Sequence, residues 1–224
     1  MTALHSAMGS VLGHTARVPR RATTDGTLRS QHVEATRRAI VAAARSSFGS
    51  RGYAGTSVDA IATAARVTKG AVYHHFAGKE ALFRAVHAEV EREAQARAIE
   101  ARDPTASPVE QIVAMVDGYL DAALDEEIRR ITLIDGPALL GLEPDVPDEA
   151  QAASWAAVRA FIAAAVERGD LVDVDPDVLI QLIGGLALQC GLLIARAADP
   201  DATRAALGQA VDAMLRGLAP HAHG

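Results

Sequence analysis

Apolar residues recur at every third or fourth position along most of this 224-residue chain, and no segment shows the strict apolar and polar alternation of a half-buried strand. The series Ile40, Ala44 and Phe48 is one example of this helical spacing. Hydrophobic residues make up 50% of the chain but aromatic residues only 4%, so aliphatic side chains supply most of the apolar surface. The sequence therefore predicts an all-α fold with enough apolar surface for one or two compact domains.

Helix-breaking residues divide this pattern into separate helices. The first helix ends at the segment 49–52, and two short helices follow at 58–64 and 69–75, with a tight turn between them. Two short helices joined in this way form a helix-turn-helix unit. A long helix is expected from residue 79 to about residue 102. Further helices are expected around residues 109–120, 126–134, 155–168, 178–198 and 207–218, the second of them ending at Asp135-Gly136-Pro137.

The same periodicity defines the expected domains. Residues 1–30 lack it and include Arg17, Arg20 and Arg21, which predicts a disordered basic tail that either contacts DNA phosphates or has no function. Residues 31–78 are expected to form the helix-turn-helix domain and residues 79–218 a second helical domain. Residues 219–224 are expected to be a flexible C-terminus.

Charge is distributed unevenly along the chain. Residues 1–84 carry 12 Lys and Arg against 4 Asp and Glu, a net +8, whereas residues 85–224 carry 10 against 24, a net −14. A basic first third on an otherwise acidic protein is typical of a DNA-binding module attached to a domain with another task. The alternative is that the uneven charge arose by chance and the charged residues only face solvent.

Several classes of protein are disfavoured. Cys190 is the single cysteine, so we expect no internal disulfide, no cysteine-based metal site and no cofactor. The first residues lack a secretory signal pattern, which predicts a cytoplasmic location. Gln181, Gln189 and Arg196 interrupt the apolar segment 178–198. This segment is therefore expected to be a core or interface helix and not a membrane span.

An enzyme is the main alternative to a DNA-binding protein. The sequence has no phosphate-binding glycine loop, no nucleophile elbow and no His-Glu-x-x-His motif. His221 and His223 are a conceivable metal pair, but a chain terminus holds ligands poorly. The sequence therefore predicts no catalytic site and no metal site, and an all-helical enzyme is the less favoured alternative.

The segment from Phe48 to Leu82 carries the strongest functional signal, with the sequence FGSRGYAGTSVDAIATAARVTKGAVYHHFAGKEAL. This segment closely resembles one known module in four features. They are the Gly-Tyr before a Thr-Ser cap, the Val-Thr-Lys-Gly before the second short helix, the Tyr-His-His-Phe and the Lys-Glu-x-Leu. That module is the DNA-binding domain of the tetracycline-repressor (TetR) family of transcriptional regulators, and the resemblance covers about residues 32–84. The 140 residues that follow it, 85–224, resemble the family only in being helical and of suitable length.

The second short helix is expected to enter the major groove of DNA. Gly70 and Ala71 keep its leading edge small, and Thr68 and Lys69 lie at its N-terminus, where free backbone N–H groups favour a phosphate. The full set expected to contact DNA is Thr56, Ser57, Arg66, Thr68, Lys69, Gly70, Ala71, Tyr73, His74 and Lys79. Packing explains His75 equally well, and Val58, Ile61, Val67, Val72 and Phe76 are expected in the core.

Arg66 departs from the family pattern, which usually has Gly in the turn between the two short helices. A left-handed backbone at Arg66 would cost about 1–2 kcal/mol. The alternatives are a reshaped turn or a useful extra cation that faces a DNA phosphate.

The resemblance implies a ligand-responsive repressor that binds a near-palindromic double-stranded DNA operator as a homodimer. It also implies that a small-molecule effector enters a pocket in each C-terminal domain, and that the long helix from Lys79 transmits a tilt to the recognition helices. A constitutive DNA-binding protein that acts through a protein partner is the alternative, because it would share the same recognition helix.

The helix around residues 178–198 is apolar nearly all round, so it must be covered on more than one side. This predicts a dimer interface that includes Val158, Ile162, Gly184, Leu186 and Leu193, with a purely internal helix as the alternative.

A mostly apolar pocket with a few polar groups is expected in the second domain. Its expected lining is Met115, Tyr119, Leu133, Trp155, Gln189 and Cys190, although ordinary core packing explains each of them as well. Gln189 is expected to face either the pocket or the dimer partner. Because the apolar stripes carry no charged residue, the sequence argues against a highly charged ligand.

Overall fold

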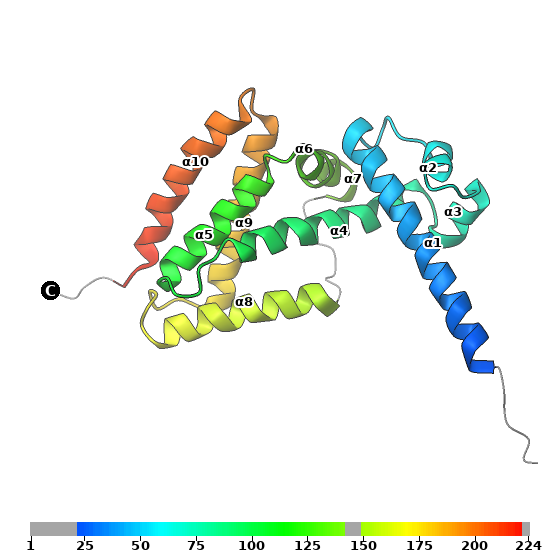
Figure 1. Cartoon of the computed structure of the whole chain (residues 1–224). Coiled ribbons are helices and arrows are strands. Elements are labelled where there is room, and N and C mark those ends of the chain that lie inside the picture. Colours follow the sequence, from blue (N-terminus) through cyan, green and yellow to red (C-terminus); the bar gives the residue numbers. More distant parts are fainter. Residues whose placement is uncertain (1–21, 142–148, 221–224) are drawn as a thin grey trace, which may run out of the picture. The chain divides into compact units, whose positions relative to one another are not determined.

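The computed structural model describes residues 22–141 and 149–220, and within these ranges the chain contains helices and connecting turns without strands. The predicted all-α fold is therefore confirmed. The chain divides into two units, Met1–Thr36 and Arg37–Gly224. The second unit contains the helix-turn-helix and all the helices that follow it (Figure 1).

The first helix, α1 (Ala22–Arg51), begins nine residues earlier than the sequence predicted. Residues 22–30 of the expected tail are therefore helical, because an isolated Gly26 does not stop a helix that has no proline. The rest of the tail, residues 1–21, lies outside the described residues, as do His221 and His223 of the expected flexible end. The C-terminal end of α1 agrees with the prediction, since Gly52 follows it with a φ of 72°.

Two short helices come next, α2 (Val58–Ala64) and α3 (Lys69–His75), with the predicted boundaries. Ser57 caps α2 and Thr68 caps α3, each through a side-chain oxygen that accepts a backbone N–H. The long helix α4 (Lys79–Glu100) follows and runs from the helix-turn-helix to the C-terminal helices (Figure 1).

Helix α5 (Pro108–Ala122) begins with a capping box between Ser107 and Glu110 and packs along α4. The two helices approach closely at Gly118, where an added Cβ would lie 2.9 Å from the Cβ of Ala101 and 3.0 Å from the Cα of Ala98. The small residues on both helices therefore fix the contact between α4 and α5.

The sequence predicted that the next helix would stop at Asp135-Gly136-Pro137, and this prediction is wrong. The chain instead continues as α6 (Glu126–Ile128), a π-helical segment η1 (Arg129–Asp135) and α7 (Gly136–Leu140). Pro137 lies in the first turn of α7, where a missing N–H leaves no hydrogen bond unmade.

Three helices complete the structure: α8 (Glu149–Glu167), α9 (Pro176–Arg196) and α10 (Pro200–Leu215), followed by the 3₁₀ turn η2 (Arg216–Leu218). Helix α9 packs against α5, α8, α10 and η1 (Figure 1). The buried side chains form two cores. One joins α1–α4 with Ile128 and Ile131, and the other joins α5, α8, α9 and α10 with Leu133.

Candidate nucleic-acid interface and inner cavity

Helix α3 has one buried side and one exposed side. Val72 is 2% exposed, and Phe76, just after the helix, is also buried, so this side packs on α1, α2 and α4. On the other side Tyr73 is 51% exposed, and Lys69, Gly70 and His74 are exposed as well. Polar groups that can reach a DNA backbone therefore cover the free side of α3.

The turn before α3 is a Schellman motif centred on Arg66. The N–H of Arg66 donates to the carbonyl oxygen of Thr63 at 3.1 Å, and the N–H of Val67 donates to that of Ala62 at 3.0 Å. Arg66 has a φ of 57°, which makes it the one described residue other than glycine in the left-handed region. The turn keeps its usual geometry, so the strain lies in the left-handed backbone of Arg66, while its side chain is exposed.

Lys69 is held by a residue that the sequence analysis missed. Its ammonium donates to Asp59 of α2 at 2.9 Å, and this hydrogen bond raises the pKa of Lys69. Both side chains are more than half exposed, so solvent weakens the pair. A carboxylate on this surface repels a phosphate, so Asp59 opposes the DNA contact that is expected of Lys69.

The other expected DNA contacts differ in their availability. Ser57 is exposed and accepts the N–H of Ala60 at 3.2 Å, and Thr68 accepts that of Ala71 at 3.1 Å. Both oxygens thus serve first as caps. Ala71 is half-buried, and a Cβ on Gly70 would meet only Thr68, at 3.8 Å. Lys79 lies 4.0 Å from the centre of the Tyr53 ring, which holds its side chain at the start of α4.

Thr56 is removed from the set of DNA contacts. Its side chain is 3% exposed, and its hydroxyl donates within the fold, to the carbonyl oxygens of Ser47 at 3.0 Å and Gly52 at 2.8 Å. The hydroxyl closes the end of α1, so it has no free surface to present to a phosphate.

A charged cluster connects α1 to the C-terminal helices. Arg45 donates to Glu93 of α4 at 2.7 Å and to Glu127 of α6 at 2.7 Å, and its guanidinium also lies 3.5 Å from Glu89. The hydrogen bond from Arg45 lowers the pKa of Glu93. Gly49 leaves room for this contact, because a Cβ there would lie 2.8 Å from the Glu127 side chain.

A second link joins the end of α1 to η1. The N–H of Gly52 donates to the carbonyl oxygen of Phe48 at 2.8 Å, and the chain then leaves the helix at Gly52, whose φ is 72°. Tyr53 therefore lies beyond the end of α1. The carboxylate of Asp135, the last residue of η1, accepts the N–H of Tyr53 at 2.7 Å. Sequence periodicity gives no signal for such a bond, because its partners are 82 residues apart.

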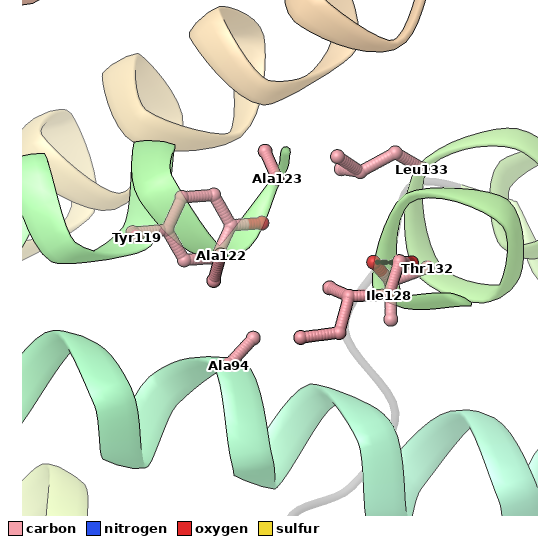
Figure 2. A pocket seen from close by; sticks show the side chains of 7 residues that line it. All are labelled: Ala94, Tyr119, Ala122, Ala123, Ile128, Thr132 and Leu133. Carbon is pink, nitrogen blue, oxygen red and sulfur yellow. Dashed lines mark hydrogen bonds between the residues drawn. The ribbon is translucent and has the colours of Figure 1, made fainter. Parts of the chain in front are cut away.

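The inner cavity lies between α4, α5, α6 and η1 (Figure 2). Its crevices are too narrow to hold a water molecule. Figure 2 shows the Tyr119 hydroxyl pointing toward this space from α5, with Thr132 and Leu133 on the opposite wall. The Thr132 hydroxyl donates to the carbonyl oxygen of Ile128 at 2.8 Å. The complete lining is Ala94, Tyr119, Ala122, Ala123, Ile128, Thr132 and Leu133.

The cavity includes two of the six expected pocket residues, Tyr119 and Leu133. Cys190 lies in the same C-terminal core, and burial raises the pKa of its thiol. Met115 is half-buried and does not line the cavity. Trp155, which is 41% exposed, and Gln189, which is also exposed, lie on the surface of the protomer and outside the cavity.

One acidic residue inside the C-terminal domain was missed. Glu91 of α4 accepts a hydrogen bond from Gln95 at 3.2 Å, and burial raises its pKa. Burial, with a smaller contribution from the charge of Glu91, also raises the pKa of the Tyr119 phenol. Glu91 escaped notice because α4 is mostly polar and shows little amphipathic pattern.

The expected dimer residues fall into two groups. Ile162 is 2% exposed and has no free surface for a partner, whereas Val158 is half-buried against the same core. Leu193 is 44% exposed, a Cβ on Gly184 would meet nothing within 4 Å, and Leu186 is half-buried. The exposed face of α9 is therefore a surface that a partner can reach, and Trp155 of α8 is exposed as well.

Within residues 22–141 and 149–220, no group of three His, Cys, Asp or Glu side chains is placed to hold a metal ion. Helix α9 is long and apolar enough to cross a membrane by length and composition, a test that the core helix of a soluble protein also passes.

Comparisons with known proteins agree on one family. A family model described as "Bacterial regulatory proteins, tetR family" matches residues 40–86, and one described as "Tetracyclin repressor-like, C-terminal domain" matches residues 109–218. A TetR-family transcriptional regulator from Pectobacterium atrosepticum is 33% identical. That match covers 85% of this chain and 98% of the other, with a TM-score of 0.74.

Two further relatives are similar over most of their length. The Transposon Tn10 TetC protein of Escherichia coli is 26% identical over 159 residues, which are 69% of this chain and 78% of that protein. The protein AibR, in its structure in complex with isovaleryl coenzyme A and operator DNA, is 25% identical in sequence to this chain. It covers 82% of this chain and 99% of the other, with a TM-score of 0.52. Together with the helix-turn-helix geometry, these matches show that the chain belongs to the TetR family of bacterial transcriptional regulators.

Proposed function

We infer that this regulator is a homodimeric repressor that binds a palindromic DNA operator through α3 and is released from it by a small, mostly apolar molecule. The observation that carries this proposal is the exposed side of α3, where Lys69, Tyr73 and His74 follow a capped N-terminus. Such a helix end attracts phosphate, and the side chains one turn further on can reach the same backbone. Ser57, Arg66, Gly70, Ala71 and Lys79 surround this side and complete the proposed interface.

The proposed dimer interface is the exposed face of α9. Leu182 is 66% exposed, and Val178, Gly185, Gln189 and Leu193 follow the same helical spacing on exposed positions. An apolar stripe of this length is unfavourable in water, and a second copy of α9 would cover it. The exposed position of Gln189 supports a role across this interface instead of in the effector site.

The proposed effector site is the inner cavity. Its lining is apolar except for Tyr119 and Thr132, which is the mixture expected of a site that binds an apolar body and orients it by a few hydrogen bonds. The structure of AibR holds isovaleryl coenzyme A together with operator DNA, which supports effector control in a relative of this chain. Because the cavity has no room for even a water molecule, an effector must expand it on binding.

The lack of space in the cavity also favours a second candidate, a constitutive DNA-binding protein without an effector. The two functions share α3 and differ only in what happens inside the C-terminal domain. Selection of bound sequences from random DNA would give the operator, and a compound library would then be screened for release of that operator. Release by any compound that also binds the free protein supports the repressor, and a bound operator that no compound releases supports the constitutive protein.

A further inference from the structure

The π-helical segment η1 forms one wall of the inner cavity. Thr132 and Leu133, from its middle, face Tyr119 and Ala123 of α5 across the empty space (Figure 2). The N–H of Gly136 donates to the carbonyl oxygen of Ile131, five residues earlier, which is the wide π register. Such turns are rare within helices and occur often at functional sites.

The segment η1 also belongs to both cores. Ile131 is fully buried in the core that contains α1, α2, α3 and the first half of α4, whereas Leu133 is 4% exposed in the core of the C-terminal helices. Side chains two residues apart therefore pack into the DNA-binding part and the regulatory part. Since close-packed cores transmit displacements, a shift of one residue must displace the other.

The end of η1 holds the end of α1. The carboxylate of Asp135 accepts the N–H of Tyr53 at 2.7 Å, and Tyr53 begins the loop that leads to α2. Close contacts surround this bond. A Cβ on Gly52 would lie 3.0 Å from Arg130 and 3.4 Å from Asp135, and one on Gly136 would lie 2.7 Å from His87 of α4. The position of η1 therefore depends on tight contacts with both α1 and α4.

We propose that η1 is a switch that couples the inner cavity to the helix-turn-helix, with Asp135 as the positioning residue. An occupant of the cavity displaces Leu133 and Thr132, and the same movement withdraws the Asp135 carboxylate from Tyr53. A change from π to α register turns the following residues by about 100° and shifts them by about 1.5 Å. This route runs through η1 and is separate from a tilt of α4. The inference rests on the proposed effector site.

The test uses a substitution as the occupant of the cavity, so it needs no identified effector. Ala123→Leu adds three carbons on the wall that faces Leu133, and Ala96→Leu makes the same change on an exposed position of α4. Amide hydrogen exchange of Tyr53 is measured by NMR in both variants and in Asp135→Ala. The amide of Phe83, in the fully buried part of α4, reports any general loss of stability.

We expect exchange at Tyr53 to rise about 10- to 100-fold in Ala123→Leu, the ratio that corresponds to the loss of a hydrogen bond to a charged group. Exchange at Phe83 should rise much less, and Ala96→Leu should behave as the unmodified protein. Asp135→Ala should show the same rise at Tyr53, and addition of Ala123→Leu to it should cause no further change. If Ala123→Leu does not fold, the smaller Ala123→Val replaces it.

Unchanged exchange at Tyr53 in a folded Ala123 variant would overturn the proposal, as would fully additive effects of Ala123→Leu and Asp135→Ala. The exchange measurement requires no DNA. A failure of the unmodified protein to select any operator would therefore count against the proposed function and leave the coupling result to stand on its own.

Discussion

The N–H of Val67 donates to the carbonyl oxygen of Ala62 at 3.0 Å, and this bond closes the turn between α2 and α3 around a left-handed Arg66. The turn that glycine forms without strain is thus formed by a residue for which the same backbone is unfavourable. The backbone geometry is kept while a positive charge is placed beside the proposed DNA surface.

Replacement of Arg66 separates these two effects. Arg66→Gly removes the strain and should raise the free energy of unfolding by about 1 kcal/mol, which is about 2–4 °C in Tm for a chain of this size. Arg66→Ala loses the same charge but keeps the positive φ, so it should give no such gain. Thermal denaturation of the two variants checks the difference, and equal stability would show that the left-handed backbone costs nothing here.

Asp59 is expected to weaken DNA binding. Asp59→Asn frees Lys69 and removes a negative charge from the DNA side, so operator affinity should rise about 1.5- to 5-fold, the range of an exposed ion pair. Asp177→Asn is the matched control, because Asp177 forms an exposed pair with Arg159 in the C-terminal domain. Binding titrations at one salt concentration compare the variants, and an equal gain in both would assign the effect to net charge alone.

The exposed face of α9 predicts how the protein assembles. Leu182→Asp places a charge on the most exposed apolar side chain of α9 and should convert a dimer into a folded monomer. Val174→Asp, in the loop before α9, is the control and should leave the dimer intact. Sedimentation velocity gives the mass and circular dichroism the helix content. A Leu182→Asp protein that remains a stable dimer would place the interface elsewhere.

The raised pKa of Glu91 predicts a pH-dependent stability. Burial favours the neutral carboxyl in the folded state, so the folded protein loses stability as pH rises through the folded pKa of Glu91. Glu91→Gln should therefore be more stable than the unmodified protein at neutral pH, and the difference should vanish below about pH 4, near the ordinary pKa of Glu. Glu100→Gln, on an exposed position of α4, should be neutral at every pH. Urea denaturation between about pH 3 and pH 8 provides the comparison.

Local sequence signals predicted most of the helices well. Ser57, Thr68 and Asp175 are N-caps where polar residues precede apolar periodicity, and α2, α3 and α9 start directly after them. The predicted stop at Asp135-Gly136-Pro137 failed because local breakers were weighed without tertiary packing. The burial of Ile131 and Leu133 in separate cores holds that segment helical through the glycine and proline.

The residues of the candidate sites could likewise be predicted only where the signal lies within one short segment. The exposed residues of α3 follow from a motif within one short segment and could be predicted. Thr56 could not be distinguished from Ser57 as a surface residue, because only the folded chain brings its hydroxyl to the carbonyl oxygen of Ser47. The pair of Asp59 and Lys69 spans two helices, and that of Tyr53 and Asp135 spans 82 residues, so neither follows from periodicity.

The salt dependence of operator binding tests the central claim, that α3 holds DNA through phosphate contacts at its N-terminus. The slope of log Kobs against log salt concentration is measured for the unmodified protein, Lys69→Gln and Arg159→Gln. Both substitutions remove one exposed cation that is paired with an aspartate, so they change net charge equally. Loss of one phosphate contact should flatten the slope by about one for Lys69→Gln, with weaker binding to every sequence, and leave Arg159→Gln unchanged. The same slope and affinity in all three proteins would contradict the assignment of α3 as the DNA-binding helix.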